Sequence, residues 1–94
     1  MEFDDYVGQP CRSKLAFEFV PKKNVRIDLG VAQNEVRSVA TIELQSKVLV
    51  MMRIGDAMVS LFPSGKVLVR NEREESAARA IAEKVVATLT DSVK

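Results

Sequence analysis

Apolar and polar residues alternate with a period of two in several stretches of the chain. This alternation is typical of β-strands with one buried face. The predicted strands are residues 15–20, 57–62, 66–70 and a strand-like run over 41–54, whose strongest part is 48–54. Gly55-Asp56 is a two-residue hairpin signal, and Pro63-Ser64-Gly65 predicts a second turn. The pattern therefore indicates a meander of three strands, or of four if residues 41–46 pair separately.

Two other stretches repeat their apolar residues with the spacing of a helix. The first is 27–40, where Asp28 is a good N-cap residue. The second follows Asn71, which forms a capping-box arrangement with Glu74. The apolar stripe of this second helix consists of Ala78, Ile81, Ala82, Val85 and Leu89.

The order of these elements predicts an α+β domain of strand, helix, three-strand meander and helix (β-α-β-β-β-α). Both helices have one apolar side, and a chain of this size has one core, so we expect both on the same face of the sheet. The other face is then bare, and it carries Met51, Phe62 and Leu68. An exposed sheet face with large apolar side chains indicates a binding surface.

The length of 94 residues indicates a single domain. Residues 1–13 lack periodicity and contain Gly8 and Pro10, so we expect a flexible N-terminal arm, with the domain spanning 14–94. The net charge of +1 gives no support to a dedicated nucleic-acid binder. The chain has neither an apolar run that could cross a membrane nor the pattern of a signal peptide, so we expect a cytoplasmic location.

Residue types that usually carry catalysis are scarce. The chain has no histidine and one cysteine, Cys11, so we expect neither a zinc site nor an internal disulfide. Ser64-Gly65-Lys66 lies in a predicted hairpin and lacks the glycines that precede a phosphate-binding loop. Without a nucleophile–base pair or a metal-ligand set, the sequence predicts a protein that is not an enzyme and needs no cofactor.

The stretch 57–89 contains the most distinctive local sequence. Residues 60–69 read Ser-Leu-Phe-Pro-Ser-Gly-Lys-Val-Leu-Val, and a helix with a glutamate-rich start follows them. With Ile27-Asp28-Leu29 and Met52-Arg53-Ile54 upstream, this stretch resembles a single repeat of the TATA-box-binding protein (TBP) family. The resemblance implies a TBP-like half domain, a curved antiparallel sheet of about four to five strands with two helices on one face.

In that family, two repeats form a saddle whose concave sheet binds the minor groove of DNA. The resemblance implies a non-enzymatic binding module that associates with nucleic acid through its concave face, as a homodimer. Glu18 falls on this face, where a carboxylate would repel phosphates, so we do not expect specific TATA recognition. The alternative is a protein–protein interaction adaptor that uses the same face. Candidate binding residues for either partner are Met51, Arg53, Met58, Phe62, Lys66, Leu68 and Arg70.

Overall fold

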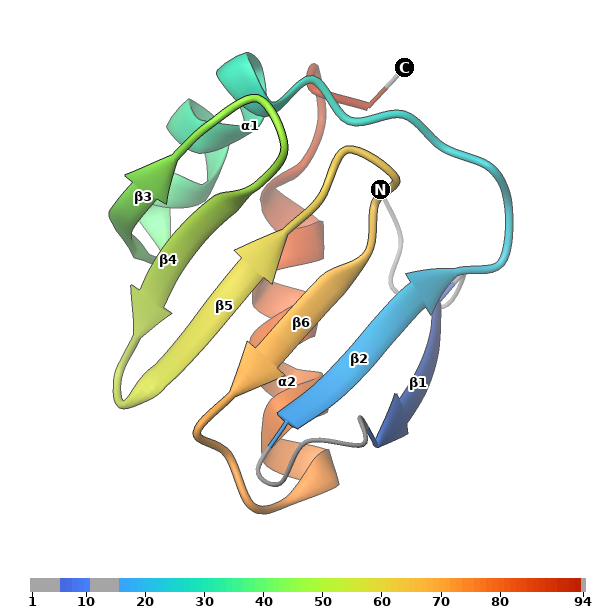
Figure 1. The fold of residues 1–94 in the computed structure, drawn as a ribbon, viewed down its shortest axis with the longest axis vertical. Helices are drawn as coiled ribbons and strands as arrows, with labels where there is room; N and C mark the ends of the chain where they lie inside the picture. Colours follow the sequence, from blue (N-terminus) through green and yellow to red (C-terminus); the bar gives the residue numbers. More distant parts are fainter. Residues whose placement is uncertain (1–5, 11–15, 94) are drawn as a thin grey trace.

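The computed structural model describes residues 6–10 and 16–93. They form an antiparallel sheet with two α-helices, as Figure 1 shows, which confirms the predicted α+β class. The sheet has six strands in the order β1-β2-β6-β5-β4-β3. In chain order the elements are β1 (Tyr6–Pro10), β2 (Ala16–Pro21), α1 (Leu29–Glu35), the 3₁₀ helix η2 (Val36–Ser38), β3 (Thr41–Gln45), β4 (Val50–Ile54), β5 (Ala57–Leu61), β6 (Val67–Arg70) and α2 (Glu75–Thr88).

The strands predicted between residues 41 and 70 all form, and the separate pairing predicted for 41–46 occurs as β3 over Thr41–Gln45. The chain reverses between β3 and β4 because the Ser46 hydroxyl accepts hydrogen bonds from the N–H groups of Val48 and Leu49, both at 3.2 Å. Gly55 makes the next hairpin with a φ of +59°, a left-handed conformation that glycine adopts without steric cost. The local turn signals therefore place these strands beside one another.

Helix α1 begins where the sequence predicts. The Asp28 carboxylate accepts hydrogen bonds from the N–H groups of Gly30 and Val31, at 3.0 and 3.4 Å, and so caps the first turn. The α-helical part has seven residues and continues as η2. The regular helix is therefore shorter than the predicted stretch 27–40.

Helix α2 begins later than predicted, and the predicted cap at Asn71 is wrong. Asn71 has a φ of 64°, a left-handed conformation that turns the chain out of β6 instead of starting a helix. The N-cap is Glu74, which makes no side-chain cap hydrogen bond. Between them, the Glu72 carboxylate accepts hydrogen bonds from the N–H groups of Arg73 and Glu74, at 3.0 and 3.3 Å.

Both helices cover the same face of the sheet, as the single-core argument predicts. In Figure 1 they lie behind the strands, and the front of the sheet faces the viewer. No helix in the described part of the chain is long and apolar enough to cross a membrane. The buried core between the layers consists of Phe19, Val50, Met52, Ala57, Val59, Leu61, Val67 and Val69 from the strands, and Ile27, Leu29, Ala32, Val36, Ala78, Ala82, Val85, Val86 and Leu89 from the helices and nearby segments.

Strand β1 lies within the segment 1–13, for which the sequence predicts a flexible arm. It pairs antiparallel with β2, from Tyr6 opposite Pro21 to Pro10 opposite Phe17. The outer edge of β2 would otherwise leave a row of backbone groups without partners, so pairing there is favourable even for a short segment without periodicity. The rest of the predicted arm, including Cys11, lies outside the described residues.

Candidate functional site

The sheet face opposite the helices carries two rows of side chains that cross the strands. Residues directly opposite each other in antiparallel strands point to the same side of the sheet, so the strand pairing defines the rows. The first row is Glu18, Leu68, Ser60, Met51 and Leu44, and the second is Ala16, Arg70, Met58, Arg53 and Thr41. We call these two rows, together with Phe62 and Lys66, the open face.

All seven candidate binding residues predicted from the sequence lie on the open face. The arginines are exposed, and the other five side chains are half-buried. This placement follows from the period of two, because each strand directs alternate residues to the helices and to the open face. The exposed pair is Arg53 and Arg70, and the half-buried residues are Met51, Met58, Phe62, Lys66 and Leu68.

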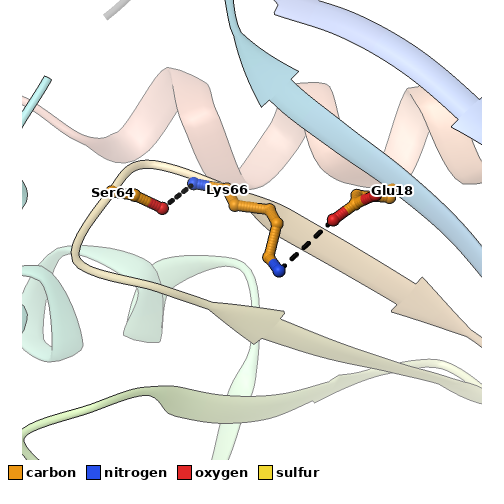
Figure 2. A network of polar contacts seen from close by, with 3 residues as sticks. All are labelled: Glu18, Ser64 and Lys66. Carbon is orange, nitrogen blue, oxygen red and sulfur yellow. Dashed lines mark hydrogen bonds and ion pairs between the residues drawn. The ribbon is translucent and has the colours of Figure 1, made fainter. Parts of the chain in front are cut away.

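Lys66 connects three elements of the open face. Its Nζ lies 3.2 Å from Glu18 Oε1 and 4.5 Å from the centroid of the Phe62 ring. In Figure 2 the side chain extends from the start of β6 toward Glu18 on β2, while its backbone N–H donates to Ser64 Oγ at 3.5 Å. The ammonium is thus held by a carboxylate and an aromatic ring, and the Glu18 charge that would repel phosphates is compensated.

Arg53 also has a carboxylate partner. Its Nε lies 3.3 Å from Glu43 Oε1, and the two side chains are 57% and 36% exposed. Glu43 lies at an irregularity of β3, where the register shifts between Ile42 and Leu44. An ion pair this exposed contributes less than about 1 kcal/mol to stability, but it lowers the positive potential around Arg53.

Arg70 differs from the other two cations of the open face. It is exposed at the end of β6, and it forms no ion pair with another described residue. Its cross-strand neighbours are Ala16 and Met58. This cation, which no carboxylate of residues 6–10 or 16–93 pairs with, therefore lies beside apolar side chains.

Leu44 belongs to the open face, but sequence reasoning did not identify it. It is 50% exposed and lies opposite Met51. The strand-like run over 41–46 was the available signal, and the register shift in β3 breaks the period of two that assigns a face. Ser60 is polar and central to the same row, yet it is only 3% exposed.

Within residues 6–10 and 16–93, no three His, Cys, Asp or Glu side chains gather in the manner of a metal site. Comparison with known proteins gave no match to a family model, to a curated protein or to a solved structure. The chemistry of the open face, with apolar side chains from four strands and an exposed arginine that has no ion pair among the described residues, is therefore the basis for assigning a function.

Proposed function

We propose that this chain is a non-enzymatic binding module whose open face binds a segment of another protein that combines apolar side chains with a carboxylate. The observation that carries the proposal is the position of Arg70. This exposed cation has no ion pair within the described part of the chain, and it lies opposite Met58 and two residues beyond Leu68.

The apolar part of the open face extends over four adjacent strands. Leu68, Met58, Met51 and Leu44 come from β6, β5, β4 and β3, and each remains at least partly exposed. A partner that covers them removes apolar surface from water, at about 25 cal/mol for each Å². Methionine side chains adapt their shape to different partners, which supports a protein segment as the occupant.

Charge complementarity selects an acidic segment. Of the cations on the open face, Lys66 and Arg53 already have carboxylate partners in Glu18 and Glu43, whereas Arg70 has no such described partner. A second copy of this chain would bring the same two carboxylates, both already paired. On the described part of the open face, nucleic acid would meet one cation without an ion pair, whereas proteins that bind it usually neutralise several phosphates. A protein segment with a carboxylate near Arg70 therefore fits better than either.

Within the α+β class, we propose that the fold is a TBP-like half domain. It is supported by the sequence over 57–89 and by an antiparallel sheet with both helices on one face. In the TBP family the uncovered face of the sheet is the binding face. This resemblance supports the choice of the open face as the site, whereas the partner is inferred from the side chains alone.

A peptide display library selected on the immobilised protein tests the proposal. We expect the selected peptides to combine apolar residues with Asp or Glu, and to shift the backbone amide resonances of β4, β5 and β6. Arg70→Glu should weaken their binding by about tenfold or more, because it turns an attraction into a repulsion. Arg37→Glu, which changes an exposed arginine of η2, is the matched control and should bind as the wild type does.

Two further measurements test the alternative partners of the open face, which are nucleic acid and a second copy of this chain. Duplex DNA is titrated at low salt, where phosphate contacts are strongest, and sedimentation equilibrium measures the mass of the protein alone. DNA binding that shifts the same amide resonances, or a dimer that Phe62→Ser dissociates, would overturn the proposal. Selected peptides that map to the helices, or that bind Arg70→Glu unchanged, would overturn it as well.

A further inference from the structure

A pocket of about 510 Å³ lies outside the open face. Its walls come from three segments, which are residues 26–30, residues 45–47 and Pro63. In Figure 1 the start of α1, the turn between β3 and β4, and the turn between β5 and β6 meet at the same end of the sheet. The volume is in the range of pockets that hold small molecules.

The pocket combines an apolar floor with two cations. Ile27 and Leu29 are 3% and 7% exposed, and Pro63 is half-buried, so packing against the core holds these side chains in place where they line the pocket. Arg26 and Lys47 are exposed and line the same pocket. Neither forms an ion pair with a described residue. Polar and charged groups placed beside apolar side chains are typical of ligand pockets.

Three other polar side chains line the pocket, Asp28, Gln45 and Ser46, and two of them are engaged in local structure. The Asp28 carboxylate accepts the cap hydrogen bonds of α1, and the Ser46 hydroxyl accepts those of the turn before β4. Asp28 Oδ1 and Ser46 Oγ therefore accept from the backbone, and the Asp28 carboxylate keeps its negative charge. Arg26 and Lys47, which belong to segments far apart in the sequence, outnumber this one carboxylate, so the charged residues of the lining carry a net positive charge.

We propose that this pocket binds a small organic anion that carries an apolar ring, with the ring on Ile27, Leu29 and Pro63 and the anionic group between Arg26 and Lys47. Guanidinium and ammonium groups both bind phosphate and carboxylate oxygens through charge-assisted hydrogen bonds. The apolar floor supplies the affinity that two exposed charges alone do not. The site is independent of the open face and of its partner.

Titration with phenyl phosphate, followed by backbone amide resonances, tests the pocket. We expect saturable shifts at residues 26–30 and 45–47. Inorganic phosphate and phenol, which each lack one half of the ligand, should both bind at least about tenfold more weakly. Absence of saturable shifts with phenyl phosphate would overturn the proposal, and so would equal affinity for either half ligand.

A double variant tests the two cations. Arg26→Gln with Lys47→Gln should weaken phenyl phosphate binding by about tenfold, the effect of losing two exposed charge contacts. Lys22→Gln with Lys23→Gln removes two exposed cations of the neighbouring loop that do not line the pocket, so this control should bind as the wild type does. Equal loss in both double variants would contradict the proposal, because it would indicate attraction by overall charge. If the first double variant fails to fold, the proposal is still tested on the wild type by comparing its affinities for phenyl phosphate, inorganic phosphate and phenol.

Discussion

At the scale of single residues, the Glu35 carboxylate connects the end of α1 to the C-terminal turn. It accepts hydrogen bonds from the N–H groups of Thr90, Asp91 and Ser92, at 3.1, 2.9 and 3.2 Å, and from the Thr90 hydroxyl. Burial by itself would raise the pKa of Glu35, but the hydrogen bonds from Ser92, Thr90 and Asp91 outweigh it and lower the pKa from 4.5 to about 2. The charged form is therefore the one that the fold favours.

Glu35→Gln should lower the free energy of unfolding by about 1 kcal/mol at neutral pH, a modest value because the carboxylate is partly exposed. A carboxyl group whose pKa is lowered by folding stabilises the protein above its unfolded pKa, here 4.5, and this contribution is lost as the pH falls toward 2. Urea denaturation measures the free energy of unfolding of the wild type and of Glu35→Gln across this pH range. The difference between these two free energies should shrink toward zero as the pH falls. Glu83→Gln, at an exposed position on α2, is the control and should change stability little. A difference that does not depend on pH would contradict this role.

At the scale of elements, α1 is short, and its position depends on contacts at both ends. The N-terminal side is held by the Asp28 cap and by backbone hydrogen bonds from Ile27 to Pro63 and from Asp28 to Ser92, at 2.8 and 2.7 Å. The C-terminal side is held by Glu35. A helix of seven residues is not stable alone in water, so these contacts and the buried side chains keep it in place.

Asp28→Ala should destabilise the protein by about 1 kcal/mol, since the first N–H groups of α1 lose their acceptor. Asp28→Asn keeps an oxygen in the same position and should retain most of the stability. Thermal denaturation of the two variants beside the wild type measures the effect. Equal stability of Asp28→Ala and the wild type would show that the cap contributes nothing.

At the scale of the whole molecule, the helices cover one face of the sheet and β1 forms one of its edges, next to β2. β1 is joined to β2 by pairing that runs along the strand, from Tyr6 opposite Pro21 to Pro10 opposite Phe17. The layer order leaves the open face uncovered by either helix (Figure 1). The fold therefore separates a side that packs against the helices from a side that neither helix covers.

Deletion of residues 1–10 should lower the free energy of unfolding by at least about 2 kcal/mol, because several strand hydrogen bonds of about 1 kcal/mol each are lost. The amides of β2 should then exchange faster with solvent, and the exposed edge should promote association at high protein concentration. Deletion of residues 1–5 leaves the β1 residues in place and serves as the control. If the β2 amides exchange with solvent at the same rate in both truncated proteins, β1 does not contribute to the stability of the sheet.

The sequence by itself determined the features that depend on neighbouring residues. The period of two assigned Met51, Met58 and Leu68 to the face opposite the core, and turn residues such as Gly55 located the hairpins. The Asp28 cap was also predictable, because an N-cap acts within one turn of helix. These interactions are local, so a sequence pattern is sufficient to identify them.

Only the tertiary structure decided which charges meet. Glu18 and Lys66 are far apart in the sequence, and the pairing of β2 with β6 brings them into an ion pair that compensates both charges. The same folding leaves Arg70 without a described ion-pair partner and brings Arg26 and Lys47 to one pocket. Such contacts depend on strand order and register, which arise from burial of the whole core at once and not from any single stretch of the chain.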